Sequence, residues 1–171
     1  MPQPTPDTQA PALILETIDG ERWTLAERSP ENFSMVVFYR GHHCPVCKGY
    51  LVQLNNIIDD YRAAGVDVVA VSMNDRDTAA QSKAEWSLDK LDLAYGLDEA
   101  TARQWGLYIS KSIKESEPGI FNEPGLFLVR PDGRLYMISI ASMPFGRPDP
   151  KDLLGKIGFV VEKGYPARGT A

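Results

Sequence analysis

The two cysteines of the chain, Cys44 and Cys47, are the residues whose type and spacing are best suited to chemistry. They lie three positions apart, and the chain has no others. The apolar run that ends at Tyr39 is typical of a buried strand, and Pro45 favours the first turn of a helix, where a missing N–H costs nothing. A helix start offers unpaired N–H groups and the positive end of the macrodipole, and both stabilise a thiolate. The pattern therefore predicts a redox-active dithiol at a helix N-terminus.

The two sulfurs are expected to have different roles. Cys44 lies nearer the helix terminus and should be the more exposed, so we expect it to have the lower pKa and to be the nucleophile. Cys47 lies deeper in the helix and should resolve the resulting mixed disulfide or sulfenic acid as an internal disulfide.

Metal binding is the main alternative for this segment. His42, His43, Cys44 and Cys47 offer four ligands in principle. Adjacent histidines on an extended backbone point to opposite sides, however, and zinc sites usually draw a second ligand pair from far along the chain. A non-enzymatic metal-binding or partner-binding module therefore stays an alternative, while the favoured interpretation needs neither a metal nor another cofactor.

Two neighbours of the cysteines could assist a thiolate. Arg40 would supply a positive charge, although an arginine that ends a strand is more often a surface residue. His43 could stabilise the thiolate when protonated or carry a proton, and a plain packing role explains it equally well.

The composition is that of an ordinary soluble globular protein. The 171 residues are 43% apolar and 24% charged, with a net charge of −5, which argues against a basic nucleic-acid footprint. No apolar run approaches the ~20 residues of a membrane span, and the first residues do not resemble a secretory signal. We expect a flexible leader over residues 1–10, one domain over residues 11–165, a C-terminal tail over residues 166–171, and a cytoplasmic location in which the dithiol is reduced at rest.

The elements that must position the cysteines follow from hydrophobic periodicity and capping signals. A hairpin is expected over residues 13–24, with Asp19 and Gly20 in its turn. Strands are expected at 33–39, 66–71, 91–95, 126–130 and 135–140, and helices from Cys44 to a cap at Gly65, from Asp75 or Asp77 to Trp86, from Asp98 to Gly106, and from Asp149 onward. Residues 110–123 are expected to form a long surface loop that is either mobile or functional. The order of these elements predicts an α/β fold with a central mixed sheet flanked by helices.

Three segments of the sequence resemble the peroxiredoxin-like proteins of the alkyl hydroperoxide reductase / thiol-specific antioxidant superfamily (AhpC/TSA). They are Val36 to Gly41 with the Cys-Pro-x-Cys that follows, Val66 to Ser72, and Gly125 to Leu135. The resemblance runs from about Pro11 to about Tyr165. It implies a thioredoxin-like fold with an N-terminal hairpin extension, and a nucleophilic cysteine at the start of the first long helix, here Cys44.

The sequence departs from that family at two positions. Peroxiredoxins carry a Pro-x-x-x-Thr-x-x-Cys motif, whereas no threonine or serine lies between Arg40 and Cys44. The arginine usually found before the later strand is replaced by Pro124. Groups of this kind stabilise charge in the transition state, so their absence favours disulfide exchange over peroxide reduction.

Pro124 is instead similar to the cis-proline of thioredoxins, with a trans proline as the alternative, and with Pro45 it would line the substrate site. The resulting prediction is a thiol oxidoreductase that acts on a disulfide or, alternatively, on a hydroperoxide. An external thiol of the thioredoxin or glutathione type would reduce it. No nucleic-acid or membrane partner is expected, and a homodimer is one option for its assembly.

Overall fold

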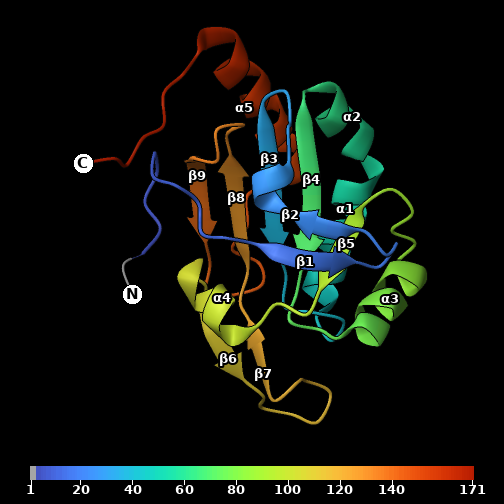
Figure 1. The fold of residues 1–171 in the computed structure, drawn as a ribbon. Coiled ribbons are helices and arrows are strands. Elements are labelled where there is room, and N and C mark those ends of the chain that lie inside the picture. The colour runs from blue at the N-terminus through green and yellow to red at the C-terminus, as the bar shows by residue number, and fades with distance from the viewer. Residues whose placement is uncertain (1–2) are drawn as a thin grey trace.

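A seven-stranded mixed β-sheet forms the centre of the molecule (Figure 1), whose computed structural model describes residues 3–171. The strand order is β2-β1-β5-β4-β3-β8-β9. These strands are β1 (Ile14–Thr17), β2 (Arg22–Thr24), β3 (Phe33–Phe38), β4 (Val66–Val71), β5 (Asp92–Tyr95), β8 (Gly125–Val129) and β9 (Leu135–Ile140). In the middle of the sheet β3 pairs in parallel with β4 and antiparallel with β8. All of β3 and β8 is buried, as expected for strands covered on both faces.

In residues 3–171, five α-helices and one short 3-10 helix accompany the sheet. They are η1 (Leu25–Glu27), α1 (Pro45–Asn56), α2 (Ile58–Ala63), α3 (Arg76–Glu85), α4 (Glu99–Gln104) and α5 (Pro150–Lys163). The side chains of Asp75, Asp98 and Asp149 accept backbone N–H groups at the starts of α3, α4 and α5. These caps confirm the helix starts that the aspartates predicted.

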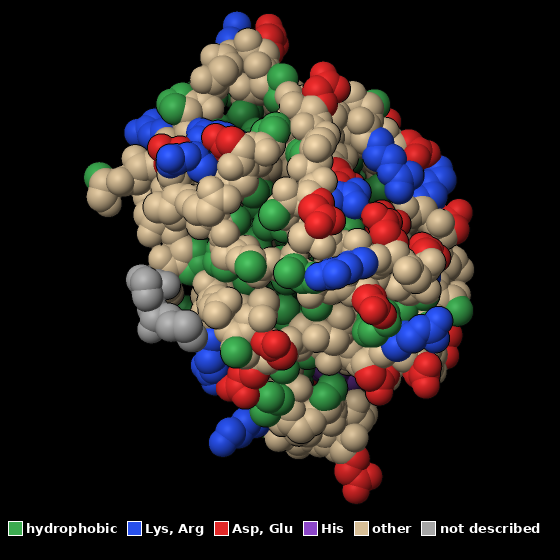
Figure 2. Space-filling view, viewed as in Figure 1, with side chains coloured by type: hydrophobic (Ala, Val, Ile, Leu, Met, Phe, Trp, Pro, Cys, Tyr) green, Lys and Arg blue, Asp and Glu red, His purple; other side chains and the backbone are tan. Residues whose placement is uncertain are grey.

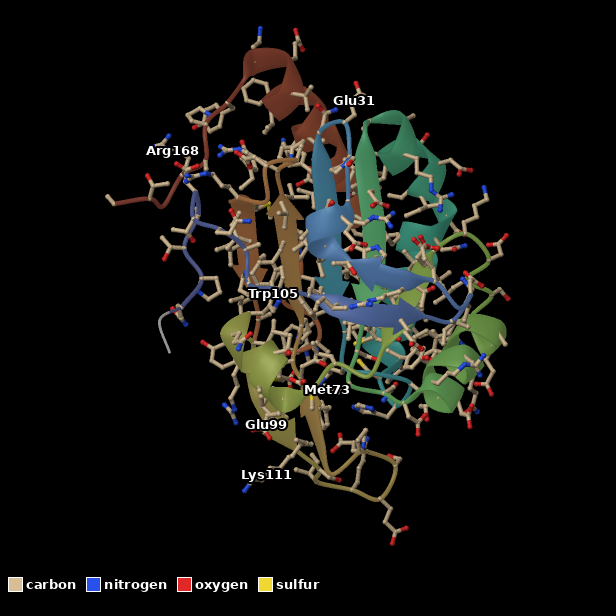
Figure 3. All side chains as sticks on the ribbon, in the orientation of Figure 1. Glu31, Met73, Glu99, Trp105, Lys111 and Arg168 are labelled. Atoms are coloured by element: carbon tan, nitrogen blue, oxygen red, sulfur yellow. The ribbon has the colours of Figure 1, made fainter. Side chains whose placement is uncertain are left out.

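Each face of the sheet carries its own hydrophobic core. Alternate side chains of a strand point to opposite faces, so Val37 of β3 joins the core under α1, α2 and α5, whereas Phe38 joins the core on the other face. That second core is covered by α4 and the N-terminal segment (Figure 1), and Trp105, labelled in Figure 3, packs there against Phe38 and Phe127. Cys44 and Cys47 belong to the first core. The dithiol is therefore held in the interior, at the start of α1.

The predicted N-terminal hairpin and the strands around it are confirmed, but the first helix is not continuous. It was expected to run from Cys44 to a cap at Gly65, and it is interrupted at Ile57. There the hydrogen bonding tightens to an i→i+3 bond from the Ile57 N–H to the Leu54 carbonyl, 3.2 Å long. Gly65 does end the second segment, with a φ of +75° that suits glycine.

Residues 110–123 are not the unstructured loop that the sequence suggested. Strands β6 (Ile109–Lys111) and β7 (Ile120–Asn122) pair antiparallel as a separate two-stranded sheet, at the lower end of the molecule in Figure 1. The strands are three residues long and partly polar, so they lack the alternating pattern by which strands are recognised. Phe121 and Asn122 are buried, which anchors this β6–β7 hairpin to the domain.

Residues 7–10, which belong to the expected leader, lie against the domain. The Asp7 N–H donates to the Leu135 carbonyl at 2.7 Å and the Ala10 N–H to the Gly133 carbonyl at 2.9 Å. Arg130 forms an ion pair with Asp7. Met1 and Pro2 of the expected leader lie outside the described residues.

The surface visible in Figure 2 mixes charges of both signs, with lysine and arginine interspersed among aspartate and glutamate. No helix in residues 3–171 has the length and apolar character that crossing a membrane requires.

Candidate active site

The loop between β3 and α1 sets the position of the dithiol. Gly41 has a φ of +133°, and a Cβ at this position would lie 2.7 Å from the Asn74 side chain, so the close approach requires glycine. Asn74 Oδ1 accepts the His42 N–H at 2.9 Å. Cys44 is the N-cap of α1, and its Sγ accepts the Cys47 N–H at 3.2 Å. Both sulfurs thus lie at the helix N-terminus, as the sequence predicted.

Arg147, from the loop before α5, contacts the deeper of the two cysteines. Its Nη2 donates to Cys47 Sγ at 3.3 Å and to the Pro144 carbonyl at 2.7 Å. The guanidinium also lies over the Tyr50 ring, 4.5 Å from its centroid. Nothing in the sequence around Arg147 marks it as a site residue, because it is 100 positions from the cysteine that it touches.

The two thiols have opposite pKa shifts. Burial would raise the pKa of Cys47, but a hydrogen bond from Cys44 and the positive charge of Arg147 outweigh it and lower that pKa to about 6. The Arg40 backbone lowers the pKa of Cys47 further. The pKa of Cys44 is raised, first by its hydrogen bond to Cys47 and then by burial.

These shifts contradict the predicted order of the two pKa values. Cys44 is also not the exposed member of the pair, because the exposed fractions are 2% for Cys44 and 0% for Cys47. Closeness to the helix terminus is not decisive here, because the strongest nearby charge reaches the cysteine one turn further in.

Arg40 lies near the dithiol and is not free to act as an isolated charge. Its Nη2 is 2.9 Å from Glu123 Oε1, and the Glu123 side chain is only 3% exposed. Its guanidinium also lies over the Phe121 ring, 5.0 Å from the centroid, and interacts with the Cys44 sulfur. The sequence left Arg40 as either a charge near the thiols or a surface residue. The structure supports the first, with the charge balanced by the buried Glu123 carboxylate.

The two histidines point away from each other. The His42 ring stacks on Trp86, with Nδ1 2.9 Å from Ser82 Oγ and Nε2 3.3 Å from Glu85 Oε2. His43 packs against Phe121, with ring centroids 4.6 Å apart. The two rings therefore do not converge on a common point, and residues 3–171 contain no cluster of three or more His, Cys, Asp or Glu that could hold an ion.

The environment of His43 favours packing over acid–base chemistry. Both of its ring nitrogens are buried and have no hydrogen-bond partner within the described part of the chain. Burial lowers the pKa of the ring, so the neutral form predominates near pH 7 and no imidazolium faces the thiolate.

The two prolines of the predicted site have separate positions. Pro45 occupies the first turn of α1 and is exposed. Pro124 is buried ahead of β8, where its carbonyl accepts the Ala141 N–H at 3.0 Å. The peptide bonds of residues 3–171 include no cis bond, so the expected cis conformation of Pro124 is wrong and the trans alternative holds.

Comparisons with known proteins agree with this arrangement. A family model described as the AhpC/TSA family matches residues 6–138. No curated protein matches the sequence.

Solved structures show the same fold at low sequence identity. The peroxiredoxin-like protein from Aquifex aeolicus superposes with a TM-score of 0.75 at 16% identity, over 94% of this chain and 90% of that one. AhpC from Enterococcus faecalis gives a TM-score of 0.75 at 18% identity, over 95% and 97%. Reduced Prx3 from Vibrio vulnificus, solved in complex with hydrogen peroxide, gives 0.73 at 15%, over 89% and 97%.

Proposed function

Because the chain belongs to the AhpC/TSA family, a family of antioxidant thiol oxidoreductases with a thioredoxin-like fold, we propose that it reduces hydroperoxides. In this proposal Cys47 attacks the peroxide and Cys44 resolves the oxidised product. The observation that carries the proposal is the Arg147 guanidinium, 3.3 Å from Cys47 Sγ. Arg147 forms no ion pair with a carboxylate of the described residues, and its Nε and Nη1 are buried without a partner.

The donors around Cys47 suit the requirements of peroxide reduction. A low thiol pKa supplies the thiolate near neutral pH. The unpartnered N–H groups of Arg147 are available to hydrogen-bond the oxygen on which charge develops, in a site shielded from water. The sequence alone suggested that the family's arginine was missing because Pro124 takes its place, and Arg147 supplies a guanidinium from another loop.

The family motif also fits better with Cys47 as its cysteine. In Pro-x-x-x-Thr-x-x-Cys the threonine precedes the cysteine by three positions, and in this chain that position is occupied by Cys44. Arg40 then takes the place of the proline. When Cys44 is aligned with the motif's cysteine, neither the threonine nor the arginine of the family has a counterpart. When Cys47 is aligned with it, the Cys44 thiol takes the position of the threonine hydroxyl.

The first chemical step forms a sulfur–oxygen bond. The Cys47 thiolate attacks one peroxide oxygen, the O–O bond breaks, and the remaining oxygen leaves as an alcohol or water after taking up a proton. Cys47 becomes a sulfenic acid, oxidised by two electrons, and the peroxide is reduced by two.

The second step closes the dithiol. The Cys44 thiol, held against Cys47 at the first turn of α1, attacks the Cys47 sulfur. The S–S bond forms as the S–O bond breaks, and hydroxide leaves as water with the proton from Cys44. An external thiol reductant then reduces the disulfide by thiol–disulfide exchange, either one dithiol of the thioredoxin type or two monothiols of the glutathione type. We expect this cycle to operate in the cytosol, with a homodimer as the assembly to be tested.

Exchange with a disulfide substrate is the competing function, and it was the one favoured by the sequence. Burial of both sulfurs argues against it, because an attacking thiolate must approach a substrate disulfide along the S–S axis. A peroxide is far smaller than a protein disulfide and needs much less opening of the site.

A stopped-flow comparison of two oxidants tests the proposal. Reduced protein is mixed with hydrogen peroxide and, separately, with a small aromatic disulfide, and unfolded protein serves as the free-thiol control. We expect the peroxide rate constant of the folded protein to exceed that of the control by at least about 10²-fold, the size of a single preorganised donor's effect. A peroxide rate equal to that of the control, with rapid disulfide exchange, would show that the protein is a disulfide oxidoreductase.

A further inference from the structure

A buried ion pair beside the dithiol has no part in the proposed reaction. Glu123 Oε1 accepts from Arg40 Nη2 at 2.9 Å and from Ser110 Oγ at 2.6 Å, and Oε2 has no partner in the described residues. Replacing such a pair with apolar residues is often neutral or stabilising. Fold stability therefore does not by itself account for a carboxylate at this position.

The pair makes the surroundings of the two sulfurs unequal. Arg147 Nη2 lies 3.3 Å from Cys47 Sγ, whereas Arg40 is close enough to Cys44 for that thiol to contribute to its raised pKa. Only Arg40 has a carboxylate in contact. Opposite charges about 3 Å apart act at longer range as a dipole, whose field falls off faster than that of a lone charge.

We propose that Glu123 is a positioning residue that selects the attacking sulfur. By pairing with Arg40 it cancels the charge that would otherwise stabilise a thiolate at Cys44, so that Arg147 acts alone and the thiolate forms at Cys47. The proposal deepens the function given above and rests on it only for the identity of the attacking sulfur.

The other groups near the pair do not change this balance. The groups that act on the pKa of Cys44 are Cys47 and Arg147, and Arg40 and Cys44 also interact. On the β6–β7 hairpin, Glu117 and Lys114 act on the neighbouring His43 with opposite signs. Glu123 is the only carboxylate within ion-pair distance of Arg40 in residues 3–171.

Partial alkylation of the reduced protein measures which sulfur is the thiolate. The protein is labelled with a small haloacetamide between pH 5 and 9, quenched, and digested after lysine and arginine. The peptide from Gly41 to Lys48 contains both cysteines, and fragmentation at the bond between Cys44 and Pro45 separates them. In the wild-type protein we expect the label first on Cys47.

The informative variant is Glu123→Gln, which frees the Arg40 charge. We expect the ratio of Cys44 label to Cys47 label to rise at least about tenfold at pH 7, equivalent to about one pKa unit, and labelling of Cys44 to begin at lower pH. Glu123→Asp keeps the charge and should restore the wild-type order. Ser110→Ala is the matched control, because it removes a hydrogen bond from Glu123 and leaves both charges, and it should not change the ratio.

The double variant Arg40→Gln/Glu123→Gln is a second arm that removes both buried charges together. The double variant should be labelled in the wild-type order. It keeps the proposal testable if Glu123→Gln alone does not fold. The proposal is wrong if folded Glu123→Gln keeps the wild-type ratio, or if the double variant labels first on Cys44. Both results are independent of peroxide turnover, so a failure of the proposed function would leave them unaffected.

Discussion

At each end of the first turn of α1 a cysteine lies near an arginine, but only one of the two arginines is paired with a carboxylate within residues 3–171. At Cys47 a thiol meets Arg147, which no carboxylate of the described residues balances. At Cys44 the nearby charge is that of Arg40, which is paired with the buried Glu123. One pKa is lowered to about 6 and the other is raised.

This contrast shows that a nearby arginine is not sufficient to make a thiolate. The stability of the thiolate depends on the net charge of the arginine together with its ion-pair partners. Burial strengthens the effect of that net charge. The helix terminus acts on both sulfurs and so does not distinguish them. The largest expected effects therefore come from exchanging or removing the groups on the Cys47 side.

Serine substitution of each cysteine is the strongest test of the contrast. Cys47→Ser should abolish peroxide consumption, because no thiolate remains. Cys44→Ser should complete a single turnover and stop at the sulfenic acid of Cys47, which a 1,3-diketone traps and mass spectrometry detects. Trapping on Cys44 in Cys47→Ser, with no trapping on Cys47 in Cys44→Ser, would reverse the two roles.

Substitution of the two arginines should give unequal losses. Arg147→Gln should lower the second-order rate constant for hydrogen peroxide by about 10²-fold, the cost of one transition-state donor. Arg147→Lys keeps the charge but not the fork of donors, so we expect a smaller loss. Arg40→Gln/Glu123→Gln should cost less than about tenfold, since it removes the Arg40 charge together with the carboxylate that balances it. Stopped-flow rates, with thermal unfolding as the folding control, measure all three, and equal losses for the double variant and Arg147→Gln would contradict the contrast.

Much of the fold followed from local patterns, and the reason is visible in particular elements. The buried apolar runs of β3 and β4, the aspartate caps of α3 to α5 and the Asp19-Gly20 turn are each encoded within a few neighbouring residues. The β6–β7 hairpin escaped prediction because its strands are too short to show an alternating pattern.

The site was predicted only as far as its residues are close in sequence. The position of both cysteines at the start of α1 follows from consecutive residues and was confirmed. Arg147 contacts Cys47 across 100 positions of sequence, and Glu123 contacts Arg40 across 83 positions. Which cysteine forms the thiolate depends on those two charges, so it could not be derived from the Cys-Pro-Val-Cys spacing.

The pH dependence of peroxide reduction should follow the ionisation of the Cys47 thiol alone. With a pKa of about 6 for Cys47, the thiolate fraction and hence the rate should rise with pH through 6 and level off above about pH 7. Below the midpoint the rate should fall about tenfold per pH unit. Arg147→Gln should move the midpoint to higher pH. Initial rates between pH 4 and 9 measure the profile, and a wild-type midpoint near the ~8.5 of a free thiol would contradict it.

The smallest effect is expected at His43, the neighbour of Cys44 that the sequence offered as a proton carrier. A general acid or base contributes about 10²–10⁴-fold, whereas the buried and unpartnered ring of His43 packs against Phe121. His43→Phe keeps an aromatic ring there, so we expect a peroxide rate within about twofold of the wild-type rate, far below the contribution of such a group. His43→Ala should lower the free energy of unfolding by about 1 kcal/mol through loss of the aromatic pair, with the pH midpoint unchanged. Denaturant unfolding and the pH profile separate these effects, and a loss above about tenfold in His43→Phe would show that the imidazole takes part in the reaction.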